Sequence, residues 1–300
     1  MTGVQTCALP ISGTLDINLD VAADAAEGEV AGYLRLTRGA DVRRIPYWLR
    51  VTRPALGGAR TTALRAPGAY LGDTRGKPAV ASRYRYPEVP PGGPVSAELL
   101  GPEQVFRVTL SKPVANFGVV ITQRGRGSRV EPRVVSAGDE NRLTGYPALP
   151  VNLNPYLAEF LEPVLVAGAI QPTAGTYDVV FDSSTAAGAG SYTFRYWLND
   201  IQPPRVRLDN GRVRRGTPLV ARLTDESSGV DATTIKLLVD GKEKTGSYRA
   251  GVLRIPTDDL RRGKHILRLQ VSDYQETRNM ENVPLILPNT RVLTTIIVVR

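Results

Sequence analysis

Turn-forming residues divide this 300-residue chain into short apolar runs. Gly, Pro, Asp and Asn recur between the runs roughly every 8 to 12 residues, a spacing typical of β-sandwiches. Apolar residues alternate with polar ones in some runs, such as Val30–Leu36, and are continuous in others, such as Phe117–Gln123. Alternation places one set of side chains on each face of a strand. The pattern predicts an all-β fold of tandem β-sandwich domains, the first of them truncated.

The predicted strands form three groups. The first group has three strands, whereas a complete sandwich has about seven, so it predicts only the end of a domain. The predicted strands of the three groups are Leu15–Val21, Val30–Leu36 and Ile45–Val51; Val105–Leu110, Phe117–Gln123, Thr176–Phe181 and Tyr192–Leu198; and Arg205–Leu208, Pro218–Thr224, Thr234–Val239, Val252–Ile255, His265–Ser272 and Val292–Val299. A linker is expected at Arg53–Gly58, and Asp240-Gly241 predicts a hairpin turn.

Two segments depart from this pattern. Pro155–Glu162, with Asn154 as N-cap and Pro163 as terminator, predicts about two helical turns. Val292–Val299 is apolar but far shorter than the ~20 residues that cross a membrane as a helix. We therefore expect no membrane span.

Composition excludes several functions. With 42% apolar and 22% charged residues, the chain is too apolar to be mainly disordered. One histidine and one cysteine cannot supply the ligands of a Cys/His zinc site. The chain also has no serine in a G-x-S-x-G context, which argues against a complete hydrolase site. We expect no catalytic residue and no enzyme activity in this chain.

The only two tryptophans occur in matching contexts. Trp48 lies in Pro-Tyr-Trp-Leu and Trp197 in Arg-Tyr-Trp-Leu, each shortly before a Pro-containing segment. An exposed pair would suit a sugar or a peptide, but large aromatic side chains more often fill sandwich cores. We expect both to be core residues.

Five acidic residues lie in predicted turns around the last group of strands. Carboxylates suit Ca²⁺, and a bound ion would rigidify the junction between the middle and last domains. The alternative is that each residue only shapes its own turn. The weak Ca²⁺ candidates are Asp200, Asp225, Asp231, Asp240 and Asp273. The lone His265, at the start of a predicted strand, is interpreted as a strand-edge residue.

Positive charge is concentrated near the C-terminus. Residues 201–300 carry 18 Lys+Arg and 11 Asp+Glu, so 18 − 11 = +7 of the formal +9 lies there. Such a patch suits an anionic cell-wall polymer or another polyanion. Nucleic acid is not expected, because no nucleic-acid-binding motif accompanies the charge. The residues of the predicted basic patch are Arg212, Arg214, Arg215, Arg261 and Arg262.

A family resemblance adds to the evidence for tandem β-sandwich domains. Residues 28–56 contain a strand ending in Leu-Thr, a short turn, and a basic strand with Ile-Pro-Tyr-Trp. They resemble the end of the fibronectin-III-like domain that follows the catalytic domain in subtilisin-like serine peptidases. Residues 101–108 and 174–181 resemble a pre-peptidase C-terminal domain, so the resemblance implies fibronectin/Ig-like and jelly-roll-like sandwiches. The last hundred residues, with Val-Asp-Gly at 239–241, are similar to bacterial Ig-like domains.

The first eleven residues, MTGVQTCALPI, resemble a translated sequencing adapter, and we expect natural sequence from about Ser12. The expected domains are then residues 12–58, 59–199 and 200–300. The resemblance implies the non-catalytic C-terminal region of a secreted or cell-surface serine peptidase. Its modules would space, stabilise or tether an upstream peptidase domain, with an anionic cell-wall polymer or a protein substrate as further partner. The alternative is an adhesin or a carbohydrate-binding protein.

Overall fold

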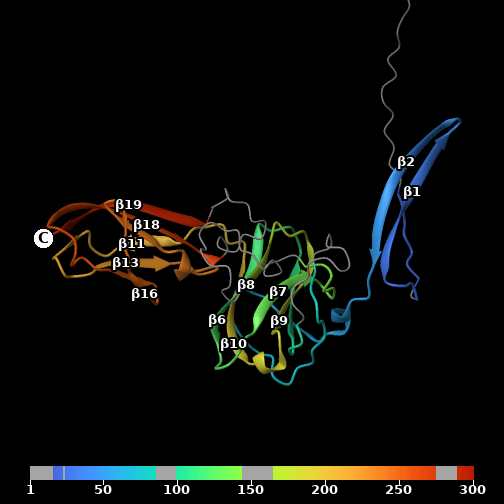
Figure 1. Cartoon of the computed structure of the whole chain (residues 1–300), viewed down its shortest axis with the longest axis horizontal. Helices are drawn as coiled ribbons and strands as arrows, with labels where there is room; N and C mark the ends of the chain where they lie inside the picture. Colours follow the sequence, from blue (N-terminus) through green and yellow to red (C-terminus); the bar gives the residue numbers. More distant parts are fainter. Residues whose placement is uncertain (1–15, 23, 86–98, 144–164, 275–288) are drawn as a thin grey trace, which may run out of the picture. The chain divides into compact units, whose positions relative to one another are not determined.

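In a computed structural model of the chain, almost all of the regular secondary structure is β-strand (Figure 1). The chain divides into two compact units, residues 1–53 and 54–300, which we describe separately. The structure describes residues 16–22, 24–85, 99–143, 165–274 and 289–300. The helix predicted at Pro155–Glu162 lies outside these residues. Three short 3-10 segments lie wholly within the described residues, and no helix among those residues is long and apolar enough to cross a membrane.

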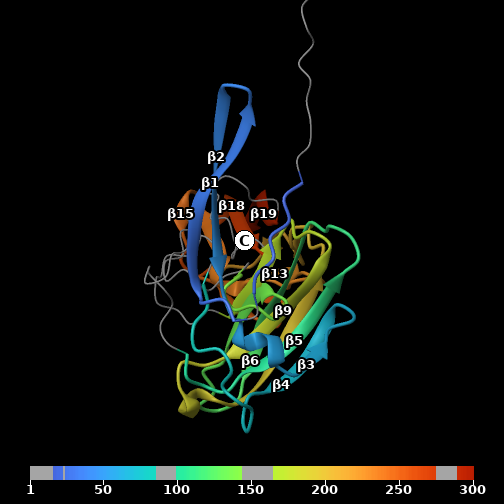
Figure 2. The ribbon, with the colours of Figure 1, turned by 90° about the vertical axis from the view of Figure 1, so that its right-hand side faces the viewer.

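The first unit contains a β-hairpin. Strands β1 (Gly28–Arg38) and β2 (Asp41–Val51) pair antiparallel along their full length and form a twisted ribbon (Figure 2). Both strands were predicted, and both extend beyond the predicted ranges. The strand predicted at Leu15–Val21 is wrong in its described part, because residues 16–21 have no regular structure. Its side chains find no neighbouring strand there with which to pair.

The hairpin has one apolar face. The pairs Val30 with Leu49 and Leu34 with Ile45 lie on the same face, because directly opposed residues of an antiparallel pair share a face. Trp48 lies on the other face and is 51% exposed. The prediction that Trp48 fills a core is therefore wrong for the described residues: a two-stranded ribbon has no second layer to cover its rings.

The middle sandwich consists of two four-stranded sheets. One sheet has the order β4 (Gly68–Asp73), β10 (Ser191–Leu198), β6 (Asn116–Arg124), β8 (Val166–Ile170). The other has the order β3 (Thr61–Ala63), β5 (Gln104–Leu110), β9 (Gly175–Asp182), β7 (Glu131–Ser136). All pairs are antiparallel except β3 with β5. The 3-10 segment η1 (Ala55–Gly58) packs its Leu56 against Val105, Val135 and Val180 of this second sheet, and η2 (Ala186–Gly188) precedes β10.

Aromatic rings fill the space between these two sheets. The ring centroid of Phe181 lies 4.6 Å from those of both Phe194 and Tyr192, and Phe106 lies 5.0 Å from Phe194. These side chains come from β5, β9 and β10, three of the four strands that the sequence predicted for this group. Apolar side chains at alternate positions thus form the core, as expected for a sandwich.

The last sandwich has a four-stranded and a five-stranded sheet. The first is β11 (Arg205–Leu208), β13 (Leu219–Thr224), β17 (Val252–Ile255), β16 (Ser247–Arg249). The second is β12 (Arg212–Val213), β19 (Thr290–Val299), β18 (Gly263–Ser272), β14 (Lys236–Val239), β15 (Lys242–Glu243). Leucines and isoleucines from both sheets form its core, including Leu219, Leu253, Leu267 and Ile297. All six predicted strands of this group are present.

Two turns of the last sandwich show how local sequence sets the strand ends. Asp240 and Gly241 have φ of 51° and 79°, which fits the predicted two-residue hairpin turn between β14 and β15. The strand predicted from Thr234 begins only at Lys236, because residues 232–234 form the 3-10 segment η3 (Ala232–Thr234). The Asp231 carboxylate caps η3 by accepting from the Thr233 N–H.

Candidate functional site

The junction between the middle and last sandwiches is built around Asp200. Its backbone N–H donates to Asn116 Oδ1 at 2.9 Å, and its carbonyl oxygen accepts from Asn116 Nδ2 at 2.7 Å. The same carbonyl accepts from Asn289 Nδ2 at 3.0 Å. Asn116 begins β6 of the middle sandwich, whereas Asn289 precedes β19 of the last one. One buried residue of the connecting segment is therefore bonded to both sandwiches.

The outer face of β10 completes this junction. Trp197 is 1% exposed and packs with Val120, Val166 and the partly buried Tyr274 of the last sandwich. The prediction of a buried Trp197 is confirmed, but the ring lies in this junction cluster and not between the two sheets. Gly118, paired with Trp197, makes room for the ring, since a Cβ there would lie 2.2 Å from it. Trp197 thus adds apolar contact to the hydrogen bonds of Asp200.

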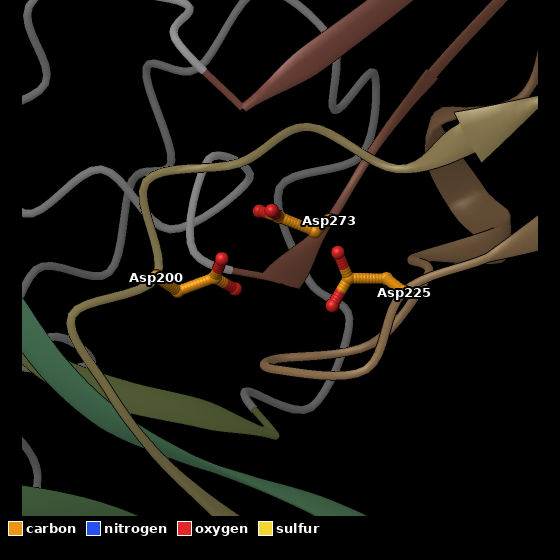
Figure 3. A group of neighbouring side chains, drawn as sticks. All are labelled: Asp200, Asp225 and Asp273. Atoms are coloured by element: carbon orange, nitrogen blue, oxygen red, sulfur yellow. The ribbon is translucent and has the colours of Figure 1, made fainter.

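Three carboxylates meet at the junction. Asp200, Asp225 and Asp273 come from three separate segments and point toward one another (Figure 3). Each offers an oxygen, and these oxygens all lie within 4.8 Å of one another. Asp200 and Asp273 are buried, and Asp225 is half-buried. Three of the five acidic residues singled out in the sequence are therefore brought together.

Backbone and side-chain donors orient these carboxylates. Asp200 Oδ2 accepts from the Ser228 N–H at 2.9 Å, and Asp225 Oδ1 accepts from the N–H groups of Ser227 and Gly229. Asp273 Oδ2 accepts from Asn289 Nδ2 at 2.7 Å. Ordered carboxylates at this separation are suited to hold a divalent cation.

Burial makes the negative charge of this cluster costly. Burial raises the pKa of Asp225, and the charge of Asp200 adds to the rise, while backbone hydrogen bonds and Arg195 oppose it. Arg195 donates to the carbonyl oxygens of Asp225 and Ser227, at 3.5 and 3.3 Å. A cavity of about 230 Å³ lined by Asp200 and Asp225 adjoins the cluster. A cation entering from this side would relieve repulsion between the carboxylates.

The other two acidic candidates lie elsewhere. Asp231 caps η3, as described above. Asp240 bonds to His265 in the β14–β15 turn region, where Oδ2 lies 2.7 Å from His265 Nδ1. His265 Nε2 lies 2.7 Å from the Arg261 carbonyl oxygen. His265 lies near the start of β18, as interpreted from the sequence, and its buried ring links the β14–β15 turn to the loop before its own strand.

The five arginines of the predicted basic patch lie at one end of the last sandwich. Arg212 is paired with Val298 near the end of β19, and Arg261 and Arg262 directly precede β18. Since Gly263 pairs with Val299, these two segments meet at the same sheet end. All five arginines are exposed.

A buried acidic pair in the middle sandwich was not predicted. Burial raises the pKa of Glu103 to about 7 and that of Asp182 to about 6. Asp182 bonds to Arg133, and Glu103 accepts from the Tyr84 hydroxyl at 3.1 Å. The available signal was a charged residue inside an apolar strand, as in Val-Val-Phe-Asp at 179–182. The sequence around Asn116 and Asn289 did not indicate their role at the junction, because Asn is common in the turns at strand ends.

Comparison with known proteins gave only distant likenesses. No family model matches the chain, and no curated protein sequence matches it. Fibronectin(III)-like modules of Clostridium thermocellum CbhA match at 13% identity and a TM-score of 0.26, over 77% of this chain and 94% of theirs. The adhesin domain of Epf from Streptococcus pyogenes matches at 11% identity and a TM-score of 0.23, over 78% and 91%. At these scores the likenesses support no conclusion about function.

Proposed function

We propose that this chain is a non-catalytic accessory region of a secreted or cell-surface subtilisin-like serine peptidase. Its modules space, stabilise or tether an upstream catalytic domain. The support from sequence is the resemblance of residues 28–56 to the domain that follows such a catalytic domain, together with the similarities of the two later sandwiches. The hairpin β1–β2 is then part of a fibronectin-like sandwich, and its apolar face packs on a second sheet of that sandwich.

The observation that carries the spacer role is the bonding of Asp200 to Asn116 and Asn289. A flexible linker between domains is exposed and makes few hydrogen bonds, so the domains move independently. Here the connecting segment is buried at Asp200, and Trp197 packs against Tyr274 beside it. The two sandwiches therefore act as one stiff body, which suits a spacer better than a tether of loose modules.

We propose that the cluster of Asp200, Asp225 and Asp273 binds Ca²⁺. The residues fit the ion, because Ca²⁺ takes several oxygen ligands and tolerates irregular geometry. The amide oxygen of the adjacent Asn289 is a neutral ligand of the same type. Because the three carboxylates come from the connecting segment and two loops of the last sandwich, a bound ion would stiffen the junction further.

A second candidate function rests on the hairpin. Tyr33 and Trp48 lie on the same face of it and are 64% and 51% exposed. The guanidinium of Arg50 lies 5.2 Å from the Trp48 ring centroid. Exposed aromatic side chains of this kind suit the apolar faces of sugars, so this face favours a carbohydrate-binding or adhesin role.

Two measurements test the proposal. Genomic sequence read upstream of Ser12 should encode the Asp, His and Ser regions of a subtilisin-like catalytic domain, and further sandwich domains in their place would favour the adhesin. Spin labels at Gln123→Cys and Thr294→Cys, in a Cys7→Ser background, report the distance between the two sandwiches. A narrow distance distribution supports the stiff spacer. A distribution as broad as that of a flexibly linked pair would refute it.

A further inference from the structure

Seven basic side chains gather at the end of the last sandwich that is remote from Asp200. They include the five arginines predicted as a patch, and the structure adds Lys264 of β18 and Arg300, which follows β19. The seven residues, here called the basic end, are Arg212, Arg214, Arg215, Arg261, Arg262, Lys264 and Arg300. All are exposed. They come from three segments that are far apart in the sequence.

Backbone contacts hold these three segments together. Arg215 N–H donates to the Arg300 carbonyl oxygen, and Arg300 N–H donates to that of Val213, each at 2.9 Å. The buried Thr257 hydroxyl donates to the Thr217 carbonyl oxygen and accepts from Gly216 N–H. Arg215 Nε donates to the Asp258 carbonyl oxygen at 2.9 Å. The backbone segments that carry the basic end therefore keep fixed relative positions, and the Arg215 guanidinium is oriented as well.

Within the described residues, the protein offsets the charges of the basic end only in part: Arg215 interacts electrostatically with Asp259. Among the residues that the structure describes, none of the seven forms an ion pair. The nearby acidic residues are Asp258 and Asp259, and the Asp259 carboxylate is already paired with Lys244. Like charges held close together retain a layer of mobile anions, and a polyanion that displaces this layer gains free energy from its release.

The position of the basic end suits a tether. Strand β18 begins there at Gly263 and runs to Ser272, next to Asp273 of the junction. At about 3.3 Å per residue, this ten-residue strand separates the two ends by roughly 30 Å. A polymer bound at the basic end would therefore not compete with the contacts at Asp200.

We propose that the basic end binds an anionic cell-wall polymer with repeating phosphodiester groups. Six of the seven residues are arginines, whose planar guanidinium groups bond phosphate oxygens in a bidentate manner. Single-stranded nucleic acid is disfavoured, because the three segments, residues 205–218, 256–268 and 290–300, contain no Phe, Tyr or Trp on which bases stack, and the ring of His265 is buried. The anchoring role of this surface rests on the proposed accessory function, but the binding itself does not.

Binding is tested with poly(glycerol phosphate) immobilised on a biosensor, and oligodeoxythymidylate of equal charge serves as the second probe. The test variant carries Arg212→Gln, Arg214→Gln and Arg262→Gln, which spares Arg215 and its bond to Asp258. The control variant carries Arg207→Gln, Arg249→Gln and Arg268→Gln, which removes the same charge from exposed positions outside the basic end. Melting curves of both variants confirm that they are folded.

We expect the wild type to bind the glycerol phosphate polymer with an affinity that falls linearly on a log–log plot against salt. The test variant should bind at least about tenfold more weakly, with a salt slope smaller by about 2 to 3, whereas the control should lose less than about threefold. Equal losses in both variants, or no wild-type binding at about 50 mM salt, would overturn the proposal. Preference for the oligodeoxythymidylate would overturn it in favour of nucleic acid. These outcomes do not depend on the distance measurement that tests the spacer.

Discussion

His265 Nδ1 lies 2.7 Å from Asp240 Oδ2, while His265 Nε2 lies 2.7 Å from the carbonyl oxygen of Arg261. A carboxylate and a carbonyl both accept hydrogen bonds, so the ring must donate from both nitrogens. A neutral imidazole has only one N–H. Only the charged imidazolium can make both hydrogen bonds, and the two contacts link the β14–β15 turn to the loop before β18.

The hydrogen bond to Asp240, followed by that to Arg261, raises the pKa of His265 above its ordinary value of 6.5. For a group whose pKa rises on folding, the stabilisation is complete below the unfolded pKa and disappears as the pH rises through the folded one. His265 is the only histidine, so an untagged sample gives one imidazole signal in an NMR titration. We expect a midpoint above 6.5 that falls toward it in Asp240→Asn. A wild-type midpoint below 6.5 would contradict this.

Asn116→Ala should loosen the junction. The substitution removes two hydrogen bonds to the Asp200 backbone; the Asp200 carbonyl keeps its bond from Asn289, but the buried Asp200 N–H loses its acceptor, which costs about 1–3 kcal/mol of unfolding free energy. Urea denaturation measures this loss, and the spin-label distance distribution should broaden in the same variant. Lys112→Ala, at an exposed position nearby in sequence, is the control and should change stability by less than about 0.5 kcal/mol. A loss of less than about 0.5 kcal/mol in Asn116→Ala would show that the hydrogen bonds between Asn116 and Asp200 do not stabilise the protein.

Excess Ca²⁺ should raise the melting temperature of the wild type relative to a sample with chelator. An ion that binds only the folded state adds about 2.7 kcal/mol at a hundred times its Kd. Asp225→Asn should abolish the difference, because it removes a charge from the cluster while an amide oxygen remains to accept the Ser227 and Gly229 N–H groups. Asp209→Asn, outside the cluster, should retain it. Equal melting temperatures of the wild type with Ca²⁺ and with chelator would contradict the proposed Ca²⁺ site.

The buried Glu103 should make the protein less stable as the pH rises. Burial raises its pKa from 4.5 to about 7, so the folded state holds a proton that the unfolded state has lost. The contribution of Glu103 to stability therefore falls between about pH 4.5 and pH 7. Glu103→Gln cannot titrate, and the stability difference between pH 5 and pH 8 should shrink by on the order of 1–2 kcal/mol. The exposed Glu243→Gln should leave that difference unchanged in denaturation curves.

Local patterns predicted most strands because they depend on properties that each segment carries by itself. Alternation in His265–Ser272 and a continuous apolar run in Phe117–Gln123 locate β18 and β6, and Asp240-Gly241 locates a turn. The strands that were missed are short, such as β12 and β15, or contain Pro or Gly, such as β7 and β8. Their strand character comes from the neighbours with which they pair.

The candidate site was predicted in part. The acidic turn residues were found, but nothing in their spacing distinguished Asp225 and Asp273 from Asp231 and Asp240. Asp200, Asp225 and Asp273 come together because their segments lie at the junction end of the last sandwich. The order of the strands in the sheets decides which turns lie at that end. The same reason separates the two tryptophans, because their local sequences match while only Trp197 has a neighbouring layer to cover it.

The sequence by itself determined the all-β class, the turn chemistry, the absence of Cys/His zinc sites and the excess of arginine near the C-terminus. Those features follow from composition and from periodicities of a few residues. Only the tertiary structure decided that Asp200 is bonded to both sandwiches, that three carboxylates share one junction and that arginines from residues 212–215 and 261–262 share one surface. Pairing and packing bring together segments remote in sequence, and no local pattern encodes those distances.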